Sequence, residues 1–230
     1  MTPAKSLAPF RIEPSPPRVH ADILARLLTS SPATLGHITD FGFIRGLVPV
    51  STIRPFAGSA LTIRIPHADS TAVHHAMSLV RAGDVVVIDQ SGDDSRSSFG
   101  GTLAAIALDA GAVAAISNGR TNDVREIDEI GFPVFSRGAT PLTTRIHGFE
   151  GRINGPVSIG GVVVMAGDIV FGDEDGVCVI PAADASAVSE RLVEMENDPV
   201  TRSLRSTVRG GTPLGEITGA AKYFGGGTHE

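Results

Sequence analysis

Two glycines stand directly before a stretch with the composition of a helix, and they are the first place where this chain could bind an anion. Gly100 and Gly101 precede the Ala-rich segment 102–110. The backbone N–H groups from Gly100 through Thr102 to Leu103 would lie at a helix N-terminus, where such groups can bind a carboxylate or a phosphate. Paired glycines also occur simply because they permit a tight turn. The local sequence leaves both interpretations open.

Two carboxylates follow the next expected strand. Asp123 and Glu126 come after the apolar segment 112–117 and at the start of a charged helical segment. Open α/β sheets bind ligands in the loops at the C-terminal ends of their strands, so carboxylates placed there are candidate ligands of a divalent metal. The alternative is structural, because Asp123 as an N-cap and Glu126 as its N3 partner would form a capping box. The spacing is compatible with both.

The distance between these two groups in the sequence is informative. Gly101 and Asp123 are separated by 21 residues, which accommodates one helix, one turn and one strand. In a parallel α/β arrangement both residues would lie on the same rim of the sheet. The sequence contains no CxxC pair, GxxxxGK[ST] loop, HExxH helix or Ser/His/Asp order that would indicate another chemistry. The glycine pair and the carboxylates are therefore the candidate site.

Three other groups of reactive side chains have simpler interpretations. The acidic segment 172–176 matches no EF-hand spacing and favours an acidic hairpin turn over a calcium site. His74 and His75 are adjacent, so on a helix they point about 100° apart, which is typical of surface or interface residues. Cys178 lies in the apolar run 177–180 and is expected to be a buried structural thiol.

Hydrophobic periodicity predicts the elements that position these residues. Strands and helices alternate through the first two thirds of the chain, which predicts parallel strands with right-handed crossovers. The expected helices are 21–29, 32–40, 69–81, 100–110, 121–130 and 181–197, and the expected strands are the half-buried 61–65 and the buried 84–89, 112–117 and 132–136. Glycine-rich strands at 157–159, 162–164, 168–171 and 177–180 predict a further β-rich layer packed on the α/β part.

Bulk composition limits the classes of partner. The chain has 230 residues, of which 42% are hydrophobic, and it carries a formal net charge of -6. That is enough apolar material for one full core, and the acidic balance argues against nucleic acid or an anionic membrane as a partner. A single cysteine is typical of the cytoplasm, and the proline-rich start lacks the apolar run of a signal sequence. We expect a cytoplasmic protein whose partner is a small molecule or another protein.

One domain with two appendages is expected. Residues 1–20, with five prolines at 3, 9, 14, 16 and 17, are expected to form an irregular N-terminal arm, and residues 21–198 a single α/β domain. Residues 199–230 are expected to form a C-terminal helical extension whose glycine-rich tail, from 219, is mobile unless a partner chain orders it.

The ordered succession of short motifs resembles a known family. The motifs are GSALT (58–62), GDVVV (83–87), FGGTLA (99–104), NDV (122–124), FPVFSRG (132–138), GDIV (167–170) and GDEDGV (172–177). In this order they resemble the 4-hydroxy-4-methyl-2-oxoglutarate aldolase and RraA-like family over residues 34–181. The resemblance implies an α/β sandwich with swivelling-domain topology. It also implies a homotrimer or homohexamer with sites between subunits.

The resemblance also implies a set of site residues. Aldolases of this family carry a glycine, twenty intervening residues, Arg-Asp, two further residues and an acidic residue. Gly101, Asp123 and Glu126 fall on that pattern, whereas Asn122 stands where the arginine is expected. The implied metal ligands are Asp123 and Glu126, and the implied metal is Mg²⁺ or Mn²⁺.

The implied chemistry is reversible carbon–carbon cleavage next to a pyruvoyl group. The backbone from Gly100 to Leu103 would receive the carboxylate of a 2-oxo acid, and the metal would stabilise an enolate, as aldol cleavage with pyruvate release or oxaloacetate decarboxylation requires. In the family an acidic residue from a neighbouring subunit assists proton transfer. Glu194 or Glu196 is the candidate here.

The missing arginine leaves two function classes. Asn122 can donate a hydrogen bond to an enolate oxygen but brings no charge. Arg120 lies two residues away and would share a face with Asn122 in an extended backbone, so it is either a replacement or a solvated surface cation. With Asp123 retained, the chain is predicted to be a metal-dependent lyase. With the arginine lost, the alternative is a non-catalytic RraA-like regulator or binding protein.

Overall fold

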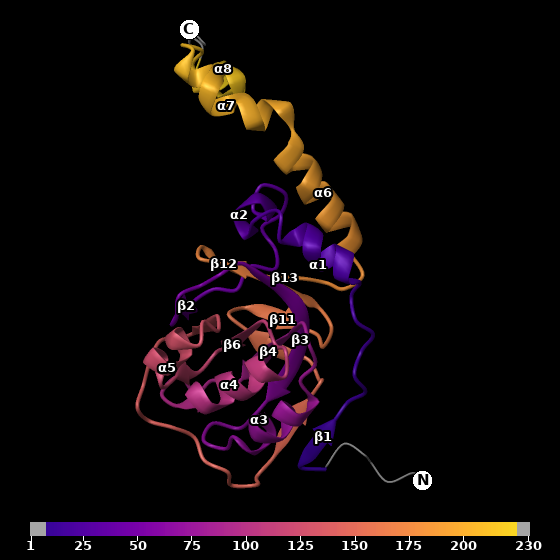
Figure 1. Ribbon diagram of the computed structural model, residues 1–230, viewed down its shortest axis with the longest axis vertical. Helices are drawn as coiled ribbons and strands as arrows, with labels where there is room; N and C mark the ends of the chain where they lie inside the picture. Colours follow the sequence, from indigo (N-terminus) through magenta and orange to yellow (C-terminus); the bar gives the residue numbers. More distant parts are fainter. Residues whose placement is uncertain (1–7, 225–230) are drawn as a thin grey trace, which may run out of the picture.

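A mixed sheet of nine strands forms the centre of the computed structural model, which describes residues 8–224 (Figure 1). Its strand order is β1-β9-β3-β4-β6-β8-β2, and β12 and β13 join it through β3. The central strands β3 (Phe56–Arg64), β4 (Asp84–Asp89), β6 (Ala114–Ser117) and β8 (Val134–Ser136) are parallel neighbours. The predicted parallel α/β arrangement is therefore confirmed.

The remaining elements surround these four strands. The other strands of the large sheet are β1 (Phe10–Ile12), β2 (Val48–Pro49), β9 (Gly151–Ile153), β12 (Ile169–Asp173) and β13 (Gly176–Ile180). Two small sheets pair β10 (Val157–Ile159) with β11 (Val162–Val164) and β5 (Ser97–Phe99) with β7 (Arg120–Thr121). The helices are α1 (Ala21–Leu27), α2 (Pro32–Leu35), α3 (Thr71–Ala76), α4 (Gly101–Asp109), α5 (Val124–Glu129), α6 (Ala185–Asn197), α7 (Pro199–Arg209) and α8 (Leu214–Ile217), with 3-10 turns at Met77–Leu79 and Ala220–Tyr223.

Both faces of the central sheet are covered. On one face Val86 and Ile88 of β4 pack with Ala104 of α4 and Ile127 of α5. On the other face the β10–β11 hairpin covers Val85 and Val87, so the strand is buried along its whole length. Full burial on both faces is the usual condition of a parallel sheet, and it explains the continuous apolar run in β4.

Two expectations about strands were wrong. The strand expected at 61–65 begins at Phe56 and is buried rather than half-buried, because β3 lies between β4 on one side and β9 and β12 on the other. The late strands also do not form one separate layer. The β10–β11 hairpin does pack on the sheet, but β12 pairs antiparallel with β3 and so extends the large sheet itself.

Several expected helices are shorter. Those expected at 21–29 and 32–40 end at Leu27 and Leu35, and the one expected to reach residue 81 ends at Ala76 and continues as a 3-10 turn. The helix expected at 121–130 starts later, at Val124, because Thr121 pairs with β5 as part of strand β7. The one expected at 181–197 starts at residue 185 after a turn.

The C-terminal helices extend away from the sheet (Figure 1). Helix α6 packs on α1 through Leu192 and Ala185, which join Leu27 in a small apolar cluster. In the described range 8–224, no residue of α7 is buried. Of the helices in that range, none is long and apolar enough to cross a membrane. The expected domain boundaries stay predictions. Of the tail expected to be mobile from residue 219 onward, Ala220–Tyr223 form a 3-10 turn and residues 225–230 lie outside the described residues.

One buried carboxylate fastens a long loop to the sheet. Asp69 is buried and accepts backbone hydrogen bonds from Thr71 at 3.0 Å, His147 at 3.0 Å and Phe149 at 2.7 Å. Burial opposes ionisation of Asp69, but these hydrogen bonds and one from the Thr71 hydroxyl outweigh it and hold its pKa well below the usual range. The carboxylate therefore ties the loop at 147–149 to the start of α3.

We predict that Asp69→Asn lowers the free energy of unfolding by about 2–3 kcal/mol at pH 7, because an amide NH₂ would face backbone donors. The pKa of Asp69 is lowered by folding, so its stabilising effect is present above the ordinary aspartate pKa of about 3.9 and is lost as the pH falls below it. Urea unfolding of both proteins from pH 7 to pH 3.5 measures this. The exposed Asp109→Asn serves as control, and an equal stability of Asp69→Asn at pH 7 would contradict the prediction.

Candidate functional site

A two-stranded parallel ladder brings the two predicted segments together. Strand β5 pairs with β7, with Ser97 opposite Arg120 and Phe99 opposite Thr121. The glycine pair follows β5 directly and Asp123 follows β7 closely, so both segments leave the ladder side by side. The backbone N–H of Gly101 donates to Oδ2 of Asp123 at 3.2 Å. The predicted proximity of Gly101 and Asp123 is confirmed.

The two glycines are required for space. A Cβ atom at Gly100 would lie 2.5 Å from Nδ2 of Asn122, and one at Gly101 would lie 2.1 Å from Oε2 of Glu126. Gly100 has an extended backbone with φ -129°, which any residue can adopt, and Gly101 is the first residue of α4. The tight-turn interpretation is therefore wrong. The missing Cβ atoms let Asn122 and Glu126 lie directly on the start of α4.

Asp123 occupies the N-cap position of α5 without capping it. Its backbone is left-handed, with φ 55° and ψ 38°, and its side chain makes no capping hydrogen bond to the described part of α5. The capping-box interpretation is therefore wrong. Instead the carboxylate turns toward the N-terminus of α4, where a negative charge is favoured by the helix dipole. A left-handed aspartate costs roughly 1–2 kcal/mol, and such strain is typical of functional sites.

Asn122 fixes this carboxylate. Its Nδ2 donates to Oδ2 of Asp123 at 2.6 Å, and its Oδ1 accepts from the Ser97 hydroxyl at 2.6 Å. The amide thus links the end of β5 to the carboxylate. It is held in place and contributes no charge.

A small pocket of about 160 Å³ opens beside Asp123. Hydroxyl groups dominate its wall, and the Ser98 hydroxyl is buried without a hydrogen-bond partner in the described part of the chain. The lining residues are Ser70, His74, Ser97, Ser98, Phe99, Gly100, Thr102, Leu103, Asn122, Asp123, Thr143 and Thr144. Sequence reasoning missed Ser70, Thr143 and Thr144 and left His74 as a surface or interface residue. No spacing rule connects these residues to the glycine pair, because they come from distant segments.

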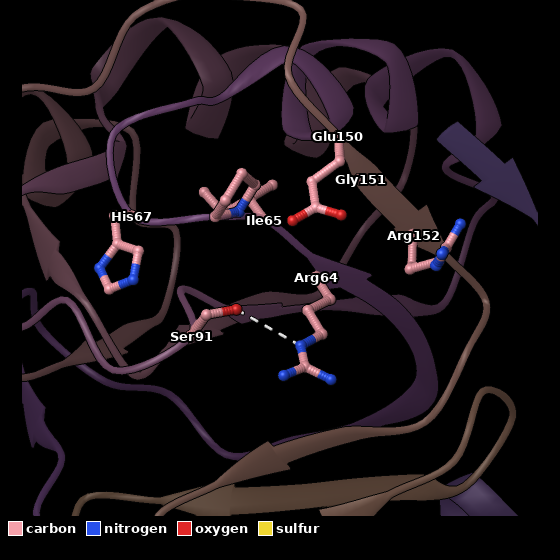
Figure 2. A pocket seen from close by; sticks show the side chains of 8 residues that line it. Arg64, Ile65, His67, Ser91, Glu150, Gly151 and Arg152 are labelled. Carbon is pink, nitrogen blue, oxygen red and sulfur yellow. Dashed lines mark hydrogen bonds between the residues drawn. The ribbon is translucent and has the colours of Figure 1, made fainter. Parts of the chain in front are cut away.

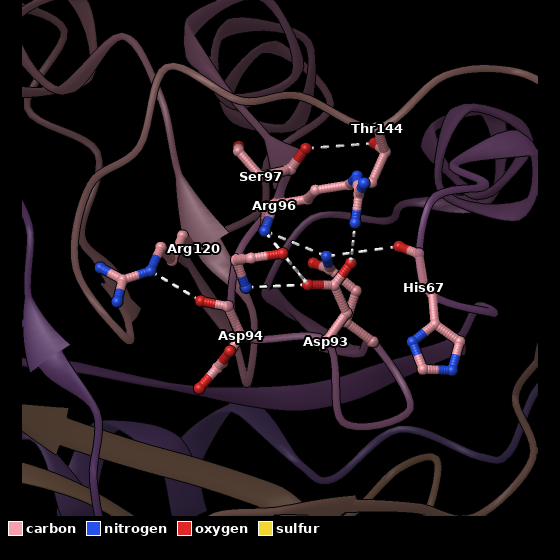
Figure 3. A network of polar contacts seen from close by, with 9 residues as sticks. His67, Asp93, Asp94, Arg96, Ser97, Arg120 and Thr144 are labelled. Carbon is pink, nitrogen blue, oxygen red and sulfur yellow. Dashed lines mark hydrogen bonds and ion pairs between the residues drawn. The ribbon is translucent and has the colours of Figure 1, made fainter.

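Arg120 points elsewhere. Its Nε donates to the carbonyl oxygen of Asp94 at 2.6 Å and one terminal nitrogen lies 3.5 Å from that of Ala139 (Figure 3). It does not line the pocket in the described structure. Arg120 therefore fastens neighbouring loops and does not offer its charge to a ligand beside Asp123.

The loop before β5 is held by its own carboxylate. Asp93 is buried, accepts from the backbone and hydroxyl of Ser95, and pairs with Arg96 at 3.0 Å (Figure 3). Burial opposes ionisation of Asp93, but these bonds outweigh it and lower its pKa to about 2. The carboxylate stays charged at neutral pH and holds in place the loop that precedes β5.

The other predicted acidic residues are not gathered at the pocket. Glu126 lies over Gly101 but does not line the pocket in the described structure. Glu194 pairs with Arg191, and Glu196 accepts from Thr34. Both are on α6, which leads away from α4 and α5 (Figure 1). A role for them at the site requires a second subunit and stays a prediction.

The remaining reactive groups behave as the sequence indicated. Residues 173 and 176 close the antiparallel β12–β13 pair, so the acidic segment is a hairpin turn. Burial, followed by the nearby Asp173 charge, raises the pKa of Cys178 to about 12, which makes it an unreactive thiol. Within residues 8–224 no group of three or more His, Cys, Asp or Glu side chains could hold a metal ion.

The chain is similar to proteins of one family. Residues 35–179 match the family described as RraA-like: Aldolase/RraA. A Halalkalibacterium halodurans protein named "Putative 4-hydroxy-4-methyl-2-oxoglutarate aldolase" is 35% identical over 158 residues, which is 66% of this chain and 75% of that protein. A Thermus thermophilus protein named 4-hydroxy-4-methyl-2-oxoglutarate aldolase is 29% identical over 126 residues, 55% of this chain and 76% of that one.

A solved structure shares the fold. The Streptomyces coelicolor protein RraAS2, described as an unusual member of the RNase ES inhibitor RraA protein family, aligns with a TM-score of 0.69 and 25% identity. The alignment covers 78% of this chain and 94% of that protein. The predicted single α/β unit with RraA-like topology is confirmed. The chain belongs to the RraA-like family, which includes aldolases and RraA proteins.

Proposed function

We propose that this protein is a divalent-metal-dependent lyase that cleaves a carbon–carbon bond of a 2-oxo acid in the pocket beside Asp123. The observation that carries the proposal is the position of the Asp123 carboxylate. It is exposed, it lies against the first N–H of α4, and only its Oδ2 is hydrogen-bonded among residues 8–224. A carboxylate oxygen is thus directed into a pocket whose wall supplies further oxygen atoms.

The side chains present fit Mg²⁺ or Mn²⁺ in one particular way. Asp123 is the single carboxylate of the described pocket wall, and Glu126 lies one helical turn behind it. Mg²⁺ is commonly held by one or two carboxylates, with water and substrate oxygens completing its shell. Asp123 would hold the cation, directly or through water, and Glu126 would support it. When bound, the cation supplies the positive charge that stabilises an enolate oxygen.

The start of α4 fits the substrate carboxylate. The first N–H groups of any helix lack partners within the helix, and here Ala104 makes the first helical bond, to Gly100. The N–H groups of Thr102 and Leu103 therefore remain to bind an anion, helped by the helix dipole. The buried Ser98 hydroxyl supplies one more donor or acceptor to an oxygen of the ligand.

Asn122 is expected to limit the rate of this reaction. Its amide is already committed to Ser97 and Asp123, so it stands in place of the family arginine without its charge. Loss of one preorganised donor to a developing oxyanion typically costs about 3–4 kcal/mol of barrier. With Arg120 bound to carbonyl oxygens of neighbouring loops, we infer that the positive charge is absent and that turnover of the usual family substrates is slow.

A second function rests on the same substitution. A protein that only binds a partner needs no oxyanion-stabilising arginine, and RraAS2 is described as a member of an RNase ES inhibitor family. The alternative is therefore a non-catalytic RraA-like regulator. Retention of Asp123 with a correctly placed α4 favours the lyase.

Asp123→Asn tests the metal site. We predict at least a tenfold loss of Mn²⁺ affinity, measured by titration calorimetry, because a neutral amide is a poor ligand for a hard cation. The far-ultraviolet circular dichroism should not change, since the Asn oxygen can still accept from Gly101. The exposed Asp109→Asn, on the same helix pair, is the matched control. Unchanged Mn²⁺ affinity in Asp123→Asn would exclude the site.

Substitutions at 120 and 122 test the missing charge. We predict that Arg120→Ala changes the rate of pyruvate release from 4-hydroxy-2-oxo acids less than threefold, which corresponds to roughly 0.6 kcal/mol or less. Asn122→Arg should raise it by about 10²–10³. Asn122→Met has similar length without charge and should give no gain. If no variant acts on these acids or on oxaloacetate, the regulator is the correct alternative.

Assembly is the remaining expectation. Large apolar side chains are exposed at Phe41, Ile146, Phe149 and Val163, which is typical of surfaces that bind another chain. We propose a homotrimer or homohexamer in which Glu194 or Glu196 approaches the site of a neighbour. Sedimentation should give three chains or a multiple of three at micromolar concentration. A stable monomer would remove these two residues from the site.

A further inference from the structure

Three arginines lie in one row across neighbouring strands. Arg11 of β1 is opposite Arg152 of β9, and Arg152 is opposite Arg64 of β3. Residues directly opposite each other point to the same face of a sheet, and like charges in that position are destabilising. The three guanidinium groups therefore repel one another unless negatively charged groups lie close to them.

Within residues 8–224, Arg11 is the one arginine of the three that pairs closely with a carboxylate. Arg11 pairs with Glu13. Arg64 is 3.9 Å from Oδ2 of Asp89, but that carboxylate already accepts from the backbone of Ser91 and Ser158 and from Asn118.

The positive charge of Arg152 is compensated even less. It donates to the carbonyl of Ala8 at 2.9 Å, and no carboxylate lies within 4.0 Å of it in the described range 8–224. Two guanidinium groups, those of Arg64 and Arg152, thus remain available in a chain whose net charge is -6.

A pocket of about 410 Å³ lies at these two arginines, a size that suits a small metabolite. Figure 2 shows Arg64, bound to the Ser91 hydroxyl at 3.3 Å, with His67, Glu150 and Arg152 around the same space. The pocket shares no lining residue with the one beside Asp123 in the described structure. It is a separate site.

The charges in this pocket indicate one class of ligand. Two guanidinium groups are suited to bind carboxylates, and Glu150 is suited to accept from an ammonium group. Glu150 forms no ion pair among residues 8–224 and lies two positions before Arg152, on the same side of an extended chain. Among the side chains that line the described pocket, two arginines and one glutamate leave a single positive charge, with Asp89 behind Arg64 and outside the lining. A dicarboxylic amino acid, with two carboxylates and one ammonium group, carries a single negative charge.

We propose that the pocket between Arg64 and Arg152 binds an acidic amino acid. The two guanidinium groups hold its carboxylates, the Ser91 hydroxyl adds a hydrogen bond, and Glu150 holds its ammonium group. This proposal does not depend on the metal site or on lyase activity.

Titration calorimetry on the full chain tests the proposal with L-glutamate, L-aspartate, glutarate and inorganic phosphate. We expect saturable binding of at least one of the amino acids, at least tenfold tighter than glutarate or phosphate. Arg64→Gln and Arg152→Gln should each weaken it at least tenfold. Arg11→Gln is the matched control, because Arg11 belongs to the same row but pairs with Glu13 and does not line the pocket in the described structure, and it should leave binding within twofold.

Glu150→Gln separates an amino acid site from a general anion site. It should abolish the preference for glutamate over glutarate while leaving glutarate binding intact. Circular dichroism and sedimentation of each variant establish that fold and assembly are preserved. The proposal is overturned if neither amino acid binds at millimolar concentration or if phosphate or glutarate binds as tightly. It is also overturned if Arg152→Gln changes the assembly while the parent shows no saturable binding.

Discussion

The site depends on one short contact, the hydrogen bond between the first N–H of α4 and the carboxylate of Asp123. Two residues of parallel pairing, between β5 and β7, place the two partners side by side. The absence of side chains at Gly100 and Gly101 leaves room for this arrangement, since a Cβ atom on either would overlap the end of the Asn122 or Glu126 side chain. A substitution at either glycine would therefore force Asn122 or Glu126 to move away from the start of α4.

The surrounding structure keeps this contact in place with buried carboxylates. Asp93 holds the loop before β5, and Asp69 ties the loop that contains Phe149 to the start of α3. Each accepts several hydrogen bonds, which lower its pKa. Each carboxylate therefore remains ionised and hydrogen-bonded at pH values well below 7. The protein groups around Asp123 are thus held by hydrogen bonds, and in the proposed function a cation and a ligand would supply the positive charge and further oxygen atoms that the pocket wall lacks. With Asn122 in place of an arginine, the described wall carries the Asp123 carboxylate and no arginine or lysine, which is the physical basis for weighing a slow lyase against a regulator.

The two pockets differ in how they obtain their charge. Beside Asp123 a single carboxylate faces backbone N–H groups and hydroxyl groups, which suits a cation together with an anionic ligand. Between Arg64 and Arg152 two cations are held together by strand register, and one glutamate faces them. The first arrangement is built from a helix N-terminus and the second from two neighbouring strands of the large sheet, β3 and β9. Their independence allows each to be tested without disturbing the other.

The sequence by itself determined the alternation of parallel strands and helices, the family, and the proximity of Gly101 to Asp123. These follow from local periodicity and from a spacing of one helix, one turn and one strand, which leaves little freedom in a parallel sheet. Only the tertiary structure decided where individual side chains point. Asp123 turns away from α5, Arg120 binds the Asp94 carbonyl instead of facing Asn122, and β12 joins β3. Residues 11, 64 and 152 meet through strand register, which is set by packing between distant segments and leaves no pattern in the sequence around each arginine.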